Sequence, residues 1–342
     1  MSRPNLSERH RRILKSVIES HVARAEPVGS QYVRMVYHLS ISPATIRGAM
    51  KRLEEDGLLA HPHTSAGRVP TEAGYRYYVD TLMDPEPLPA PTRRAVDSAF
   101  ASRRGDPLED PHAVAARVLA KWSGQLALVA VQPWAELPVR RVALVPLEEG
   151  VLLLALEERG ARVATTTWRP AEPCPPGTVR SAERWIAAGL PLRSAEACAA
   201  LARLAAQTAP AAIRPIVADA LQRAGKLLDS LRRPEVRIGG AENIASQPEF
   251  QTADRLRGLV ALIAEPEPLT RALRGFMESG GARITIGREN GEGTMRACSI
   301  VGTGVVSKRF RGSVGVLGPV RMRYPRLLSL VSYVGERLPE LT

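Results

Sequence analysis

The sequence contains few cysteines and few aromatic residues, and each shortage argues against a class of protein. Its 342 residues include three cysteines, Cys174, Cys198 and Cys298, which are far apart and form no Cys-x-x-Cys pair. This spacing argues against a disulfide framework and a structural zinc site, and it fits a reducing cytoplasm. Aromatic residues make up 4% of the chain, so leucine, valine, isoleucine and alanine must form most of the core.

Long apolar segments are also missing. No run of about 18 apolar residues occurs, which argues against a transmembrane helix, so we expect no membrane partner. The first residues form no apolar segment and are rich in arginine instead, with Arg3, Arg9, Arg11 and Arg12. We therefore expect no secretory signal and a cytoplasmic location.

Motifs typical of enzymes and metal sites are scarce. Gly302-Thr303-Gly304 lacks the third glycine of a dinucleotide-binding fingerprint, and no P-loop occurs. His61 and His63 are close in sequence, but no cysteine or carboxylate flanks them, so they predict no metal site. Glu289-Asn290 could place an acid beside an amide, although a neighbouring turn signal favours a structural role. We expect no catalytic residue, no metal ligand and no cofactor.

Positive charge is what the chain has in excess. Lysine and arginine total 47 against 35 acidic residues, which gives a formal net charge of +12. Basic side chains neutralise phosphates and release counterions, so this balance favours a polyanionic partner. Nearly all of these cations are arginine, and alanine is frequent, which is typical of a GC-rich genome. Net charge alone therefore supports nucleic-acid binding only weakly.

Residues 1–83 carry the clearest structural pattern. Ser42 is a good N-cap residue, Pro43 suits the first helical position, and Gly57 suits the end of that helix. Two short strands are expected at 58–60 and next to Pro70, with a polar loop between them. Apolar spacing and helix-breaking residues together predict four helices, over 5–25, 30–37, 43–56 and 72–83. Three helices followed by a small hairpin predict a winged helix-turn-helix.

The third predicted helix carries the residues expected to read DNA. A helix that enters the major groove needs small or polar residues at its N-terminal end. Ser42 and Ala44 permit close approach, and Thr45 and Arg47 are the expected base readers. A surface helix with a solvated charged face fits this pattern about equally well. The expected phosphate contacts are Lys51, Arg52, His63, Ser65 and Arg68.

The rest of the chain predicts an α+β fold. Four prolines over 84–91 form a semi-rigid spacer that marks a domain boundary, and helical sequence follows to about Trp122. Asn290-Gly291 is a hairpin-turn signal. Strands are expected over 126–131, 139–147, 151–156, 284–287, 295–301 and 313–317. Helices are expected over 181–231 and 324–338.

The chain resembles the HrcA family of heat-inducible transcription repressors. In the N-terminal part the resemblance is carried by Ser42–Arg47, by Pro62–Thr71 and by Gly74–Asp80. Farther along it is carried by Gly239-Gly240, Pro248-Glu249-Phe250, Ile286–Asn290, Cys298–Val301 and Gly315–Met322. The matching segments span nearly the whole chain, and residues 171–233 match least.

This resemblance implies a domain plan and a function. It implies a winged helix-turn-helix over 1–83, a linker and connecting helix over 84–122, and a GAF-like α/β domain over 123–170 and 234–342. An inserted helical dimerisation segment would occupy 171–233. The implied protein is a homodimer that binds a double-stranded DNA operator, an inverted repeat of the CIRCE type, represses chaperone operons and releases DNA on heat stress. The implied second partner is the chaperonin GroEL, which keeps the repressor active.

The chain departs from the family pattern at one place, and two alternative functions stay open. Gly48-Ala49 stand where family members usually carry Asn-Glu, which predicts a variant operator or a larger role for the neighbouring residues. A regulator gated by a small molecule in the GAF-like domain is one alternative. An enzyme joined to a DNA-binding domain is the other, and only Glu289-Asn290 favours it.

Overall fold

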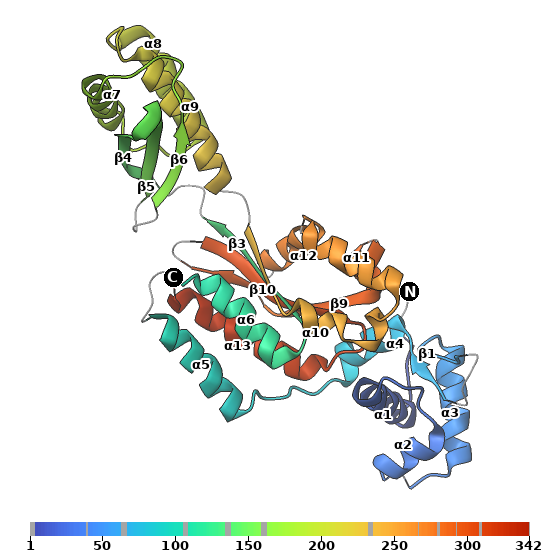
Figure 1. Ribbon diagram of the computed structural model, residues 1–342. Helices are drawn as coiled ribbons and strands as arrows, with labels where there is room; N and C mark the ends of the chain where they lie inside the picture. The colour runs from blue at the N-terminus through green and yellow to red at the C-terminus, as the bar shows by residue number, and fades with distance from the viewer. Residues whose placement is uncertain are drawn as a thin grey trace. The chain divides into compact units, whose positions relative to one another are not determined.

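The computed structural model has a mixed α+β fold, as the sequence predicts (Figure 1). The chain divides into two compact units, residues 1–131 with 235–342 and residues 132–234. No helix within the described ranges is long and apolar enough to cross a membrane. The structure describes residues 4–38, 40–62, 67–104, 109–133, 138–158, 163–231, 235–265, 267–278, 281–291, 293–307 and 310–341.

The first unit opens with three helices, as expected. Ser7 caps the first helix, and its hydroxyl accepts a hydrogen bond from the backbone of His10. Ile13 and Val17 from the first helix and Leu53 from the third are fully buried, so one stripe of each helix lies in the core. The helices are α1 (Glu8–Arg24), α2 (Ser30–Val36) and α3 (Pro43–Glu55).

A two-stranded antiparallel hairpin and a further helix follow. Thr71 caps this helix, and the Thr71 side chain also donates to the Gly57 carbonyl at 2.7 Å. The predicted helix over 72–83 forms, but its second half is wound as a π-helix. The elements are β1 (Leu59–Ala60), β2 (Val69–Pro70), α4 (Glu72–Tyr77) and η1 (Tyr78–Leu82).

A five-stranded sheet in the order β7-β3-β10-β9-β8 forms the centre of the rest of this unit. Side chains alternate between its faces, so Ala127 and Val129 of β3 join the core that contains the buried side chains of α6 and α13. Leu126 and Leu128 join the core that contains the buried side chains of α11 and α12. The strands are β3 (Leu126–Pro133), β7 (Glu235–Gly239), β8 (Arg283–Ile286), β9 (Cys298–Val306) and β10 (Phe310–Pro319).

Helices pack on both faces of this sheet (Figure 1). α10, η3, α11 and α12 connect β7 to β8, η4 and η5 connect β8 to β9, and α5 packs against α6 after the proline-rich spacer. The longer helices are α5 (Ala90–Arg104), α6 (Pro111–Ser123), α11 (Ala253–Ala264), α12 (Glu267–Met277) and α13 (Tyr324–Arg337). The short ones are α10 (Ala241–Ala245), η3 (Pro248–Phe250), η4 (Gly287–Asn290), η5 (Gly293–Ala297) and η6 (Leu338–Leu341).

The second unit has its own sheet and its own core. Three antiparallel strands in the order β4-β5-β6 pack against three helices, with Leu154, Trp168 and Val217 in the shared core. The strands are β4 (Val139–Pro146), β5 (Leu152–Glu158) and β6 (Val163–Trp168). The three helices are α7 (Pro176–Ala188), α8 (Ala195–Thr208) and α9 (Arg214–Leu231), and the short η2 (Glu148–Gly150) lies between β4 and β5.

This arrangement corrects the expected boundary of the insertion. The strands predicted over 139–147 and 151–156 do form, but they belong to the second unit and not to the larger sheet. The insertion therefore begins near residue 132 rather than at 171. Alternating apolar residues indicate that a strand forms, whereas the sheet that the strand joins depends on pairing with residues far away in sequence.

The hairpin-turn signal at Asn290-Gly291 lies between two antiparallel strands, but their connection is longer than a tight turn. β8 and β9 pair in antiparallel fashion, but their last partners are Ile286 and Ser299, so a longer connection with two short helices joins them. The Asn290 amide donates to the Cys298 carbonyl at 2.8 Å and accepts from the Thr285 hydroxyl. Asparagine side chains compete in this way with backbone turn geometry, and here the side-chain bonds determine the loop.

Candidate nucleic-acid interface

The exposed side of α3 carries the residues predicted to contact DNA. Ile46, Met50 and Leu53 are buried on the opposite side, as the helical repeat of 3.6 residues requires. The structure thus brings the predicted helix residues together on one exposed surface. They are Ala44, Thr45, Arg47, Gly48, Lys51 and Arg52.

Ser42 organises the start of this helix. Its hydroxyl accepts a hydrogen bond from the Thr45 backbone at 3.1 Å and lies 2.9 Å from the Thr45 hydroxyl. A serine N-cap satisfies a backbone donor that the helix itself leaves unpaired. Ser42 therefore holds Thr45 in place at the exposed helix start, next to the small Ala44.

The cations on α3 differ in their partners. Between residues that the structure describes, no ion pair engages Arg47 or Lys51, which lie one helical turn apart. Arg52 faces the carboxylates of Glu55 and Asp56 at 3.4 Å each. The Arg52 side chain is 62% exposed, and ion pairs of an exposed arginine are weak, so these pairs leave Arg52 able to bind a phosphate.

Arg68 has a different environment from the one the sequence suggested. Its Nε donates to Glu54 Oε2 at 2.8 Å, and its side chain is only 19% exposed. Its backbone pairs with Val28 through two hydrogen bonds of 2.8 and 2.9 Å. Arg68 thus connects the base of the hairpin loop to α3 and to the turn before α2. His63 and Ser65 lie outside the described residues.

Two shallow grooves flank α3, and both include residues of α2. One has a volume of about 540 Å³ and is lined by Gly29, Ser30, Gln31, Arg47, Met50 and Arg68. The other has a volume of about 620 Å³ and is lined by Gln31, Arg34, Met35, His38 and Pro43. Gln31 and Arg34 are exposed and were not predicted as site residues. The sequence contained a signal for their exposure: Val33 is apolar and buried, and on a helix Gln31 and Arg34 then lie away from the buried side.

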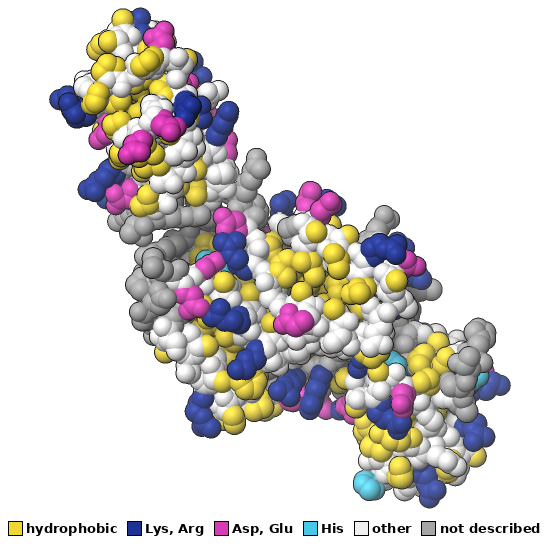
Figure 2. All heavy atoms as spheres, viewed as in Figure 1, with side chains coloured by type: hydrophobic (Ala, Val, Ile, Leu, Met, Phe, Trp, Pro, Cys, Tyr) yellow, Lys and Arg dark blue, Asp and Glu magenta, His cyan; other side chains and the backbone are white. Residues whose placement is uncertain are grey.

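Charge on this part of the surface is moderate. Residues 1–83 contain 12 basic and 8 acidic residues. On the face drawn in Figure 2, Lys and Arg side chains are interspersed with hydrophobic ones. No described group of three or more His, Cys, Asp or Glu side chains is placed to hold a metal ion. The positions of individual basic side chains on α3, and not a large excess of positive charge, therefore distinguish this surface.

A set of contacts behind this surface connects α1 and α4 to the start of α13 and to η3. The Tyr75 hydroxyl of α4 lies 2.8 Å from His21 Nδ1, and its ring packs edge-on against Tyr324 with centroids 6.1 Å apart. Arg321 donates to the Val22 carbonyl at 3.0 Å and to Glu249 at 2.7 Å. The helices next to the exposed surface are thus held by charged and aromatic contacts.

His21 makes this contact sensitive to pH. Burial and the nearby Arg321 lower the pKa of His21 to about 4, while Glu249 opposes the shift. The unfolded chain, whose histidine pKa is about 6.5, binds the proton first as pH falls. The stabilising effect of neutral His21 is therefore complete above about pH 6.5 and is lost towards pH 4, with a slope of at most about 1.4 kcal/mol per pH unit.

Denaturant unfolding at several pH values, followed by hydrogen exchange in α1 and α4, measures this loss. His21→Gln is the control, because it keeps a polar side chain but cannot take up a proton in this range. The variant should lose less stability than the parent between pH 6.5 and 4. Equal losses would mean that carboxylates elsewhere cause the pH dependence.

Comparisons with known proteins cover the whole chain. Residues 112–328 match the family model for the HrcA protein C terminal domain. The heat-inducible transcription repressor HrcA of Frankia casuarinae is 34% identical over 344 residues, which cover 97% of this chain and 99% of that protein. The repressor of the same name from Chloroflexus aurantiacus is 34% identical over 357 residues, which cover 100% of this chain and 95% of that protein.

A solved structure supports the fold. The crystal structure of a hypothetical protein superposes with a TM-score of 0.63 and 23% sequence identity, over 98% of both chains. Sequence similarity thus extends from the N-terminal helices to α13, and the fold agrees over the same length. The chain belongs to the HrcA family of heat-inducible transcription repressors.

Proposed function

We propose that this repressor acts as a homodimer that binds a CIRCE-type inverted repeat in front of chaperone operons and releases it on heat stress. HrcA proteins are transcription repressors and not enzymes, and repression of this kind requires DNA binding. The observation that supports the proposed operator binding is the exposed side of α3. Thr45 and Arg47 are exposed there near the helix start, and Arg47 forms no ion pair with another described residue.

In this proposal, residues 1–83 form a winged helix-turn-helix. α3 is the reader helix, the β1–β2 hairpin is the wing, and α2 lies across the DNA backbone. Thr45 and Arg47 read base edges in the major groove, and Ser42 and Ala44 allow the helix to approach closely. The proposed phosphate contacts are Lys51, Arg52, His63 and Ser65, together with the exposed Gln31 and Arg34.

The larger sheet with helices on both faces is proposed to be a GAF-like domain, and residues 132–234 the dimerisation segment. An inverted-repeat operator requires a two-fold symmetric dimer. The second unit exposes large apolar side chains that a partner copy could cover, namely Val145, Leu147, Val163 and Leu204, which are 40–59% exposed. A cytoplasmic location and GroEL as the partner that keeps the repressor active complete the proposal and rest on the family resemblance.

The ligand-gated alternative has less support. A small molecule would need space between the larger sheet and its helices. Phe250, Phe276 and Leu128 are at most 2% exposed there and pack in one core. Glu289 and Asn290, the pair that favoured an enzyme, are occupied by contacts to Arg76 and to the loop backbone.

Binding to defined DNA tests the proposal. The full chain is titrated by fluorescence anisotropy against a duplex with the CIRCE inverted repeat, a duplex with one half-site scrambled, and a fully scrambled duplex. We expect two chains per intact repeat and an affinity at least about 10³-fold above that for the scrambled duplex. Folded protein that binds all three duplexes equally would contradict the proposal.

Arg68 is predicted to position the wing rather than to bind a phosphate, because Glu54 already occupies its guanidinium. Arg68→Ala should weaken operator binding by about ten-fold while leaving the slope of log affinity against log salt nearly unchanged. Loss of a phosphate contact would instead lower that slope by about 0.9. Lys51→Ala is the matched control and should show the lower slope. A lower slope for Arg68→Ala would restore Arg68 as a phosphate contact.

A further inference from the structure

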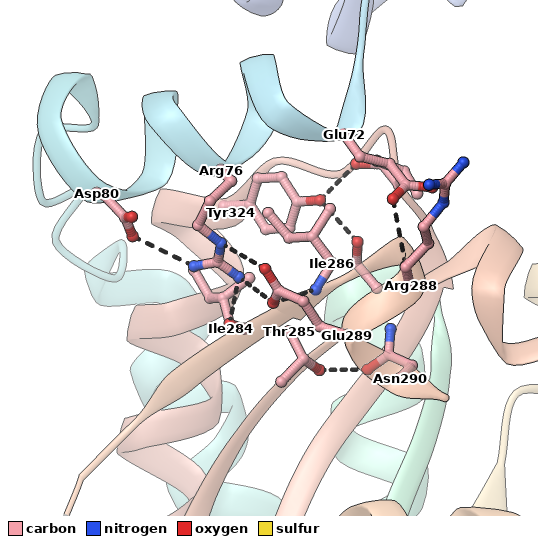
Figure 3. Close-up of polar contacts among 12 residues, drawn as sticks. Glu72, Arg76, Asp80, Ile284, Thr285, Ile286, Arg288, Glu289, Asn290 and Tyr324 are labelled. Carbon is pink, nitrogen blue, oxygen red and sulfur yellow. Dashed lines mark hydrogen bonds and ion pairs between the residues drawn. The ribbon is translucent and has the colours of Figure 1, made fainter. Parts of the chain in front are cut away.

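Arg76 on α4 is bound by a side chain more than two hundred residues away in sequence (Figure 3). Its Nε donates to Glu289 Oε1 at 2.9 Å, and one terminal nitrogen donates to Glu289 Oε2 at 2.5 Å. The same nitrogen donates to the Ile284 carbonyl at 2.8 Å, and the other terminal nitrogen reaches Asp80 at 3.2 Å. A paired, bidentate arginine fixes orientation as well as distance.

Arg76 uses most of its hydrogen-bond donors within the protein. An arginine carries five N–H donors, and Glu289, Ile284 and Asp80 accept hydrogen bonds from four of those of Arg76. The Arg76 side chain is 29% exposed, and the Glu289 side chain is 44% exposed. This arginine therefore acts within the protein, although it follows the hairpin that is proposed as the wing.

The loop that carries Glu289 is itself held in place. Glu289 Oε2 accepts a hydrogen bond from the Ile286 backbone at 3.0 Å. Gly287 has a positive φ of 57° and lies against Glu72, where a Cβ atom would come within 2.3 Å of the carboxylate carbon. Glu72 also accepts from the Arg288 backbone at 3.3 Å. Glu289 thus bonds to the backbone of its own loop as well as to Arg76, and the loop contacts α4 through both Glu72 and Arg76.

The orientation of α4 in turn determines that of the exposed surface. Thr71 at the start of α4 bonds to Gly57 and Leu58, which directly follow α3. A continuous series of contacts therefore runs from Glu289 through α4 to the residues after α3 within the first unit. In a dimer on an inverted repeat, two reader helices must enter successive major grooves about 34 Å apart. The angle at which each α3 is held then decides which half-site spacing fits.

We propose that Glu289 is a positioning residue that sets the half-site spacing accepted by the repressor, by holding Arg76 and with it α4 and α3. This inference rests on the proposed function as a dimeric operator-binding protein. Glu289 contacts no base or phosphate in this account. Its removal leaves the DNA-binding surface of each subunit intact. The angle between the two α3 helices of the dimer then becomes less restricted.

The test compares Glu289→Ala with Glu265→Ala in the full chain. Glu265 is an exposed residue at the end of α11, and its substitution removes the same charge. Affinity is measured by fluorescence anisotropy on CIRCE duplexes whose half-sites are moved apart or together by one to five base pairs. A duplex with a single half-site measures the DNA-binding surface alone. Arg76→Lys, which keeps the charge but not the fork, is the second variant.

We expect Glu289→Ala to bind the single half-site within about two-fold of the parent and the natural repeat about ten-fold more weakly. Its affinity should vary less with spacing than that of the parent, and Arg76→Lys should behave similarly. The inference would be overturned if the affinity of Glu289→Ala depended on half-site spacing in the same way as that of the parent. It would also be overturned if the variant lost as much affinity for the single half-site as for the natural repeat. A folded parent that binds no repeat would instead overturn the proposed function.

Discussion

Arg47→Ala is expected to weaken binding to the operator by about ten- to a hundred-fold, and binding to random DNA by about two-fold at most. An arginine that forms a bidentate contact with a guanine contributes about 1–3 kcal/mol of discrimination against the wrong base. Arg47 is exposed one turn into α3, and between the described residues no ion pair competes for its guanidinium. Its side chain borders the groove between α2 and α3.

The measurement is a pair of titrations, against the intact repeat and against a random duplex at the same salt concentration. Arg34→Ala is the matched control, because Arg34 is an exposed arginine on α2 and borders the second groove. It should weaken both titrations by a similar factor, as a phosphate contact does. An equal loss on both duplexes for Arg47→Ala would make Arg47 a phosphate contact as well.

Gly74→Ala is expected to destabilise the N-terminal helices and hairpin by about 3 kcal/mol. A Cβ atom at Gly74 would lie 2.1 Å from the carbonyl oxygen of Leu58. That oxygen belongs to the backbone, and it already accepts a hydrogen bond from Thr71. α4 cannot keep its place against the hairpin when this methyl group is added, so operator binding should be lost together with stability.

Gly48→Ala is the opposite case and serves as the control. Gly48 lies on the exposed side of α3, and a methyl group added there would have no atom outside its own helix turn within 4 Å. Alanine is also favoured over glycine inside a helix by about 1 kcal/mol. Hydrogen exchange of the amides in α1, α3 and α4 measures both effects, because it reports local opening. Unchanged protection in Gly74→Ala would contradict the packing described for α4.

The local elements of the N-terminal part were predictable because their signals are local. Ser42 and Pro43 begin α3, Thr71 begins α4, and the apolar spacing of α1 assigns Ile13 and Val17 to the core. Each of these signals depends on residues within a few positions of one another. The helical repeat of 3.6 residues also predicted which side of α3 is exposed, and the candidate residues of α3 lie together on that side.

The features that depended on distant partners were not predictable. Glu54 occupies Arg68, and Glu289 occupies Arg76, because folding brings together segments that no sequence pattern relates. The same reason explains why β4 and β5 were assigned to the wrong sheet.

Genome-wide mapping of the DNA bound by this repressor, before and after heat shock, tests the central claim most directly. Before heat shock, the account predicts occupancy at inverted repeats upstream of chaperone operons, with two half-sites at a fixed spacing. After heat shock, that occupancy should fall while chaperone transcripts rise. Occupancy that lacks an inverted repeat, or that stays unchanged on heating while chaperone transcripts rise, would contradict the account.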